Sequence, residues 1–398
     1  MQKINILSVV FGLLGCSAMA GGIDRSGQPL EVLFKDGNYA QLSFGYVFPN
    51  VNGDDISGAV AGIPTDAKYK EVAKGFPAYG FGLKYQVNEQ FSLALIGNED
   101  FGSDIKYDEI AGSNLGGTQA LADSYAVSLI GRYEFTENWS AHAGLRADWA
   151  QGEITLNGLA YGGPSQPPGS PIPSGVSGYN VDLDSDLGFG YLVGGAYERP
   201  DIAMRVALTY FSAIEHDFET TETFALDLNG DRIADTTVSP ETSTTKVKTP
   251  QAINLDLQTG IAPNTLLFGG IRWSEWSEFL INPETFAEAT GATLVSLDDT
   301  ITYRIGLAHR LNENWAVQGS FAYEKPQDRL VSPLAPSTGL QQIGLGAVYT
   351  YEKMEVAAGA RYSWLGKGYA ETGTPDVARA TFGDSTALSV GLRVGFYF

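Results

Sequence analysis

The chain has 398 residues, a formal net charge of −21 and only 18% charged residues, together with 48 glycines, 20 tyrosines and 20 phenylalanines. This composition suits many strands and few exposed helices. The negative charge argues against nucleic acid as a partner, because phosphate binding needs clustered lysine and arginine.

The first twenty residues have the form of a secretory signal peptide. Lys3 precedes an apolar run over residues 4–14, and small residues stand at Ala18 and Ala20. Cleavage after Ala20 would remove Cys16, the single cysteine, and the mature chain would then have no disulfide. The alternative is that "LLGC" is a lipoprotein processing site with a lipid on Cys16. No later apolar run reaches about 18 residues, so we expect no transmembrane helix.

From Tyr39 onward, segments of alternating polarity follow one another without helical periodicity. The last segment, "ALSVGLRVGFYF", has Leu388 and Val390 on one face and Arg393 on the other. Reading strands between the polar connections gives about fourteen, from Tyr39 to Phe398. Short connections are expected near Asn88 and Asn138, at 199–201, near Pro263 and Asn312, and at 351–353; long ones are expected at 52–74, 103–122, 157–184, 225–245, 282–296, 326–338 and 368–379.

Short and long connections alternate strictly along the chain. Outer-membrane barrels have short periplasmic turns and long external loops, whereas a soluble sandwich has no reason to sort its loops in this way. Closure also removes the exposed strand edges that an open sheet of this size would have. We therefore expect an all-β, transmembrane antiparallel β-barrel over residues 39–398, in the bacterial outer membrane, with both termini periplasmic.

The two faces of the expected strands differ. One face carries aromatic and aliphatic side chains such as Tyr79, Leu83 and Tyr85, and aromatic residues gather beside the short turns, as in an interfacial girdle. The other face would line the lumen with basic residues among a few acidic ones. The arginines either pair with these carboxylates and brace the wall, or attract an anionic head group. The charged lumen residues are Lys84, Arg132, Arg146, Arg205, Arg272, Arg304, Arg361, Arg393, Glu134, Asp148, Glu198 and Asp256.

Several stretches resemble the FadL-like long-chain fatty-acid transporters of bacterial outer membranes. They are "NYAQLSFGYVFPNVNG", "GIRWSEWSEF", "YRIGLAHRLNENWAVQGSFAYEKP" and "DLGFGYLVGGAYERPDIAMRVALTYFSAIEHDF". The resemblance implies a monomeric barrel of fourteen strands whose lumen is plugged by an N-terminal hatch. It also implies that hydrophobic substrates bind in the lumen and leave sideways through a gap in the wall. Residues 21–38 would be the hatch, although they are short and lack the family's Asn-Pro-Ala motif.

The resemblance places the lateral opening at an inward kink of the third strand, "FSLALIGNEDFGSDI". Here Gly97, Asn98, Glu99, Asp100 and Gly102 interrupt an otherwise apolar strand. Polar groups facing lipid are costly, which gives a kink or bulge a physical reason. The alternative is that the strand simply ends near the membrane surface.

The stretch "DLNGDRIAD" has the spacing of an EF-hand calcium loop. Asp227, Asn229, Asp231 and Asp235 stand at relative positions one, three, five and nine. However, Arg232 replaces the usual glycine, and Val238 stands where a bidentate glutamate is expected. The four acidic and amide residues are therefore a candidate calcium site, and the alternative is a solvated acidic loop. No cofactor is otherwise required.

The predicted function is passive uptake of hydrophobic compounds, with long-chain fatty acids as the leading substrate and aromatic hydrocarbons next. The alternatives are a diffusion porin for small hydrophilic solutes and a structural or adhesive surface barrel. An enzyme is not expected, because the three histidines show no metal-site spacing and no serine is singled out beside one.

The expected substrate contacts come from the hatch and the inward strand faces. Leu30, Val32, Phe34 and Phe268 would give apolar contact, whereas Arg272, Arg304 and Arg393 would attract a head group. Other expected partners are outer-membrane lipids and the barrel assembly machinery, which would recognise the terminal Phe398.

Overall fold

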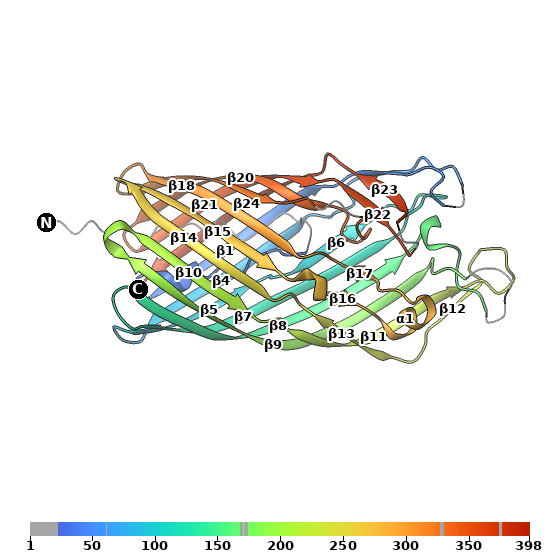
Figure 1. The fold of residues 1–398 in the computed structure, drawn as a ribbon, viewed down its shortest axis with the longest axis horizontal. Coiled ribbons are helices and arrows are strands. Elements are labelled where there is room, and N and C mark those ends of the chain that lie inside the picture. The colour runs from blue at the N-terminus through green and yellow to red at the C-terminus, as the bar shows by residue number, and fades with distance from the viewer. Residues whose placement is uncertain (1–22, 61, 168–169, 171–173, 327–329, 374–375) are drawn as a thin grey trace.

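The computed structural model describes residues 23–60, 62–167, 170, 174–326, 330–373 and 376–398. In these residues the chain forms a closed barrel of fourteen antiparallel strands, three of which are interrupted (Figure 1). In chain order they are β1 (Tyr39–Asn50), β4 (Phe76–Gln86), β5 (Phe91–Asn98) with β6 (Gly102–Lys106), β7 (Gln119–Glu134), β8 (Trp139–Leu156), β9 (Tyr179–Arg199), β10 (Met204–Phe211) with β11 (Glu215–Leu226), β13 (Ser243–Lys248) with β14 (Ala252–Ala262), β15 (Thr265–Ser274), β18 (Thr300–Arg310), β19 (Trp315–Glu324), β20 (Thr338–Tyr351), β21 (Met354–Gly366) and β24 (Thr386–Tyr397).

The barrel closes between its first and last strands. β1 pairs with β24 from Tyr39↔Tyr397 to Asn50↔Thr386, and with β4 on its other side. Every strand of the wall therefore has neighbours on both sides over most of its length, which removes the exposed edges of an open sheet. The predicted fold is confirmed.

The two ends of the barrel differ in their connections. The short turns and the C-terminus lie at the left end in Figure 1, and the long connections lie at the right end. The strands extend further than the sequence indicated: β6 continues to Lys106, β7 begins at Gln119 and β9 at Tyr179, all within expected loops. Polar residues beyond the apolar belt can continue the hydrogen-bonded ladder, because their side chains meet water and not lipid.

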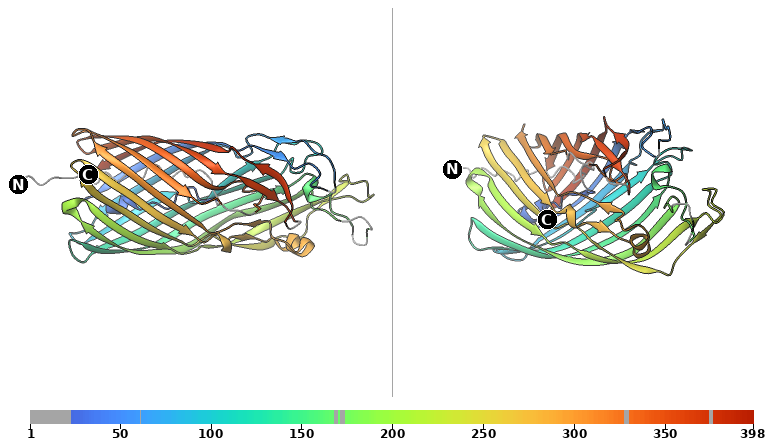
Figure 2. Two further views of the ribbon diagram at one scale, coloured as in Figure 1. Left: turned by 45° about the horizontal axis from the view of Figure 1, so that its top comes forward. Right: turned by 45° about the vertical axis from the view of Figure 1, so that its right-hand side comes forward.

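The long connections are folded, whereas their sequences predicted only polar loops. Four short strands form a separate sheet (Figures 1 and 2). One α-helix lies in the chain between two further short strands, which pair with each other. Tyr69, Tyr107 and Phe382 pack there as buried rings, with centroids 5.1 Å apart for Tyr69 and Tyr107. The elements of this end are β2 (Gly53–Asp55), β3 (Lys68–Tyr69), η2 (Leu159–Tyr161), β12 (Thr236–Val238), η4 (Trp276–Glu278), β16 (Leu280–Ile281), α1 (Glu284–Thr290), β17 (Val295–Ser296), β22 (Gly368–Glu371) and β23 (Ala378–Phe382); η3 (Pro200–Ile202) is a short turn at the other end.

The outer wall exposes large apolar side chains. Leu145 and Phe189 are each 71% exposed, which a water-facing surface would not normally present over so many strands. Beside the short turns, the rings of Trp139 and Tyr197 lie 4.7 Å apart, and other aromatic residues stand at the same level. This is the apolar band and aromatic girdle of a membrane barrel, so the soluble-sandwich alternative is wrong. In the part of the chain described, no helix is long and apolar enough to cross a membrane.

The N-terminal segment (residues 23–38) runs inside the barrel. Its 3-10 helix η1 (Glu31–Phe34) buries Val32, Leu33 and Phe34 in a cluster with side chains of β5, β7 and β9. The guanidinium groups of Arg132 and Arg205 lie 4.8 and 4.3 Å from the centre of the Phe34 ring. Cation–π contact and apolar burial together hold the segment against the inner wall.

Candidate functional site: a lumen cavity and a gap in the wall

The third barrel strand is interrupted where the sequence analysis expected it. β5 pairs with β4 only as far as Asn98↔Gly80, and the strand resumes as β6 at Gly102. Against β7, the pairing passes from Asn98↔Ala126 to Gly102↔Asp123, so the three residues 99–101 lie opposite the two residues 124–125. This is a bulge with one extra residue. The strand continues beyond it, which is not what a simple strand end would show.

The interruption leaves a gap in the ladder between β4 and β6. In the described residues, positions 76–79 of β4 have no pairing with the third strand. The ladder resumes further out, where the Lys74 N–H donates to the Asp104 carbonyl at 2.8 Å and the Lys106 N–H donates to that of Val72 at 2.7 Å. The gap is therefore bounded on both sides and lies between residues 76–79 and 99–103.

The N-terminal segment pairs with the free edge of this gap from inside. Asp24 and Phe101 form an antiparallel bridge. The Arg25 N–H donates to the Asp100 carbonyl at 2.8 Å, and the Gly102 N–H donates to the Ile23 carbonyl at 2.9 Å. The segment thus satisfies backbone groups that the kinked strand would otherwise leave unpaired.

Asp100 fixes the segment to the wall. Its buried carboxylate accepts hydrogen bonds from Ser26 Oγ at 2.6 Å, Gln28 Nε2 at 3.2 Å and Asn98 Nδ2 at 2.8 Å. It also forms an ion pair with the buried guanidinium of Arg146 on β8. Of the residues predicted to form the lateral opening, Asp100 therefore anchors the N-terminal segment to the wall.

A cavity of about 210 Å³ occupies the lumen beside the N-terminal segment. It also reaches the gap, because the outward-facing Tyr79 and Phe81 of β4 line it together with lumen residues. Among the predicted lateral-opening residues, Asp100 and Gly102 do not line this lumen cavity. The predicted residues that do are Leu30, Val32, Phe34, Gly97, Asn98, Glu99, Phe268, Arg272, Arg304 and Arg393.

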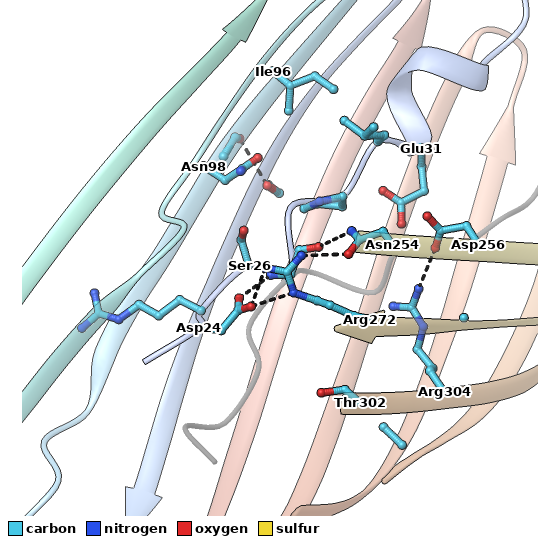
Figure 3. A pocket seen from close by; sticks show the side chains of 18 of the residues that line it. Asp24, Ser26, Glu31, Ile96, Asn98, Asn254, Asp256, Arg272, Thr302 and Arg304 are labelled. Atoms are coloured by element: carbon cyan, nitrogen blue, oxygen red, sulfur yellow. Dashed lines mark hydrogen bonds and ion pairs between the residues drawn. The ribbon is translucent and has the colours of Figure 1, made fainter. Parts of the chain in front are cut away.

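The three predicted head-group arginines each have a carboxylate partner. Figure 3 shows Arg272 between Asp24 and Asn254, and Arg304 directed toward Asp256. An anionic ligand would have to compete with these carboxylates, since an arginine that is already neutralised attracts a second anion weakly. The ion pairs are Arg272–Asp24 at 2.7 Å, Arg304–Asp256 at 3.6 Å and Arg393–Glu355 at 2.9 Å.

A second, apolar cavity of about 90 Å³, which the sequence did not predict, lies toward the external end. Its walls include Phe101 from the gap, Phe218 from β11, and Phe279 and Leu334 from long connections. Among the described residues that line it there is no lysine or arginine. Ile23 lines this cavity and Asp24 lines the lumen cavity, so the N-terminal segment stands between the two. Strand periodicity could not reveal this cavity, because Phe279, Leu297 and Leu334, which complete its wall, come from long connections.

The candidate calcium loop is closed by its own hydrogen bonds. Asp227 accepts from the backbone N–H of Gly230 at 2.6 Å and of Arg232 at 2.7 Å. The Gln166 side chain, followed by these backbone donors, holds the pKa of Asp227 below its usual value. Arg232 adopts the left-handed φ of 69° that a glycine would usually supply.

The other candidate calcium ligands also form hydrogen bonds within this loop. Asn229 Nδ2 donates to Asp235 Oδ1 at 3.2 Å, and Asp231 accepts from the Ile233 N–H at 2.9 Å. Among the residues that the structure describes, no group of three His, Cys, Asp or Glu is arranged to hold a metal ion. Calcium binding stays a prediction.

Comparison with known proteins agrees with this architecture. The model of the family described as outer membrane protein transport protein (OMPP1/FadL/TodX) matches residues 25–394. Similar solved structures include a Pseudomonas aeruginosa FadL homologue (TM-score 0.69, 17% identity, 96% of this chain and 97% of that one) and the Pseudomonas putida toluene transporter TodX (0.63, 11%, 98% and 100%).

A third similar structure is the Ralstonia pickettii toluene transporter TbuX, with a TM-score of 0.62, 14% identity, and coverage of 97% of this chain and 96% of that one. At such identities the likeness concerns the fold alone. No curated protein sequence matches the chain. The family match over nearly the whole length shows that this chain belongs to the OMPP1/FadL/TodX family of outer-membrane transport proteins, as the resemblance in its sequence indicated.

Proposed function

We propose that this outer-membrane channel binds hydrophobic compounds in its lumen and releases them sideways through the gap in the third barrel strand, without an energy source. The observation that carries the proposal is the extent of the lumen cavity. It is lined by Arg272, which faces inward, and by Tyr79 and Phe81, which face outward. A cavity bounded by both faces of the wall is a route from the lumen toward lipid.

The apolar cavity favours a small neutral substrate. A dry apolar cavity of about 150 Å³ can hold benzene, so a volume of about 90 Å³ is nearer to a single ring than to a long acyl chain. A carboxylate in this cavity would find no lysine or arginine among the described lining residues and would lie close to the carboxylate of Asp123, which disfavours a second negative charge. Single-ring hydrocarbons are therefore the proposed substrate class.

Long-chain fatty acids, the leading substrate of the sequence analysis, are the alternative. The lumen cavity supports them, since Arg272, Arg304 and Arg393 line it and could bind a carboxylate if their own partners moved. Two of the similar structures are described as toluene transporters, which agrees with the neutral class.

Uptake into liposomes separates these possibilities. We expect protein-dependent entry of labelled toluene to exceed that of labelled oleate, and entry of a small sugar to stay near that of protein-free vesicles. Oleate entry without toluene entry would reverse the substrate assignment. Sugar entry without either hydrophobic compound would contradict the proposed function and favour a diffusion porin.

A further inference from the structure

We infer that Arg25 is a latch: its side chain passes from the lumen side through the gap and closes the gap by pairing with Asp123 on the outer face of the wall. The inference rests on the proposed lateral release for its role in transport. The contacts that define the closed gap are independent of the substrate.

Asp123 lies on the outer face of the wall. Asp123 lies on β7 in the same alternation as Leu121, which is 42% exposed, and the Asp123 side chain itself is 47% exposed. An exposed carboxylate on this face can bind a cationic side chain that reaches it from the gap. Its partner is Arg25, with Nη1 3.0 Å from Oδ1.

Arg25 starts on the opposite side of the wall. Its backbone pairs with the third strand from inside, and the adjacent Asp24 binds Arg272 of the lumen cavity. The Arg25 side chain is only 4% exposed although it meets a half-exposed carboxylate. Because its backbone is on the lumen side and its guanidinium pairs with Asp123 on the outer face, the Arg25 side chain lies within the wall. The gap is the part of the wall that has room for this side chain.

The surroundings of the guanidinium fit that placement. Its Cζ lies 4.1 Å from the centre of the Phe76 ring on β4, and Glu99 is 3.8 Å from Nη1. On the third strand, a Cβ at Gly102 would overlap the guanidinium, so the glycine provides space that another residue would fill. Arg25 thus occupies the gap between Phe76 and Gly102, with charge and ring contacts on both sides.

Two tyrosines close the gap further along. The rings of Tyr79 on β4 and Tyr125 on β7 stack with centroids 5.3 Å apart and an angle of 20°. In the barrel these strands are separated by the third strand. Their outward rings can meet because the interrupted strand between them withdraws. Opening the gap to lipid requires that the Arg25–Asp123 pair breaks and that this stack separates.

The first test replaces Arg25 by alanine, with Arg199→Ala as the matched control. Arg199 pairs with Asp201 on the surface of a short turn, away from both cavities. We expect R25A to raise single-channel ion conductance in planar bilayers several-fold and to speed toluene release from the protein into liposome membranes. R199A should behave as the wild-type chain.

A reversible lock gives the second test. Asp24 and Phe101 form a non-hydrogen-bonded antiparallel pair, in which Cα atoms lie about 4.5 Å apart and a disulfide can form. The D24C/F101C variant is measured in its oxidised form and in its reduced form, so that the disulfide is the difference between the two samples. We expect the oxidised form to transport toluene several-fold more slowly than the reduced form.

The outcomes distinguish the latch from the proposed function. If wild-type protein carries no hydrophobic compound but R25A raises conductance, the proposed function fails and the latch stands as a closure of the wall. If wild-type protein transports toluene while R25A matches R199A in conductance and release, and oxidation of D24C/F101C changes nothing, the latch is overturned.

Discussion

Asp100 shows how a single carboxylate can organise the break in the third strand. It is 1% exposed, and it joins Ser26 and Gln28 of the N-terminal segment to Arg146 of β8. A buried carboxylate is tolerated only when its oxygens are paired, and here the pairing partners come from three parts of the chain. Removing it would also leave Arg146 buried without this partner. The polar residues that interrupt the strand are therefore part of its anchorage.

The hydrogen bonds of Asp227 limit how strongly the candidate calcium loop can bind the ion. We expect at most weak binding, with a dissociation constant of about 10⁻⁴ to 10⁻³ M, because Asp227 already accepts backbone N–H groups and Val238 cannot supply bidentate oxygens. Isothermal titration of the refolded protein measures it, and D227A should remove the heat. Binding below the micromolar range would contradict this expectation, and the absence of heat up to millimolar calcium would reject the site.

At the scale of elements, the N-terminal segment acts both as a short strand and as a plug. Residues 23–25 complete the ladder at the free edge of the third strand, while η1 fills the lumen near β5 with buried Leu33 and Phe34. The N-terminal segment is short, and pairing with the wall gives it a fixed position that its few apolar residues alone would define poorly.

Deleting residues 23–36 should turn the barrel into a leakier pore. The deletion removes both the pairing at the gap and the side chains of η1 from the lumen, so ions should pass where protein now stands. Planar-bilayer conductance measures the change, and the heat-modifiable mobility of the folded barrel on gels checks that the wall still forms. Conductance equal to that of the full chain would contradict the plug.

For the whole molecule, the arrangement of charge and apolar surface fits uptake of hydrophobic compounds better than diffusion of hydrophilic ones. The formal net charge is −21, yet many arginines face inward, and Arg272, Arg304 and Arg393 of the lumen cavity are paired with carboxylates. The N-terminal segment occupies the lumen, and Leu33 is fully buried there. An open aqueous channel for solutes would need that space.

Assembly of the whole barrel should depend on its last residue. Phe398 is 58% exposed, and its N–H donates to the Asn38 carbonyl at 3.2 Å, so its ring contributes little to packing. We propose that the ring is recognised by the barrel assembly machinery. Deleting Phe398 should lower the amount of folded protein in outer-membrane fractions while leaving the urea midpoint of refolded protein unchanged. Leu311→Ala, at an equally exposed site, is the control; equal losses in both variants would contradict recognition.

The barrel could be predicted from sequence because its information is local. Alternation around Leu388 and Arg393, and the regular order of short and long connections, each depend on neighbouring residues. The pairing of Asp24 with Phe101 could not be predicted in this way, since backbone hydrogen bonds between distant segments leave no pattern in side-chain type. The apolar cavity escaped for a related reason: Phe279 and Leu334 come from connections whose packing only the folded chain reveals.

The extra residue in the third strand also changes the phase of that strand. Before the bulge the even-numbered Ala94 and Ile96 are buried toward the lumen, whereas after it the odd-numbered Ile105 is buried and Lys106 is exposed. An uninterrupted strand would have kept one parity and would have turned Ile105 outward and Lys106 inward. One inserted residue therefore switches which side chains face outward in the outer half of the strand, and the wall gains an opening at the point where the switch occurs.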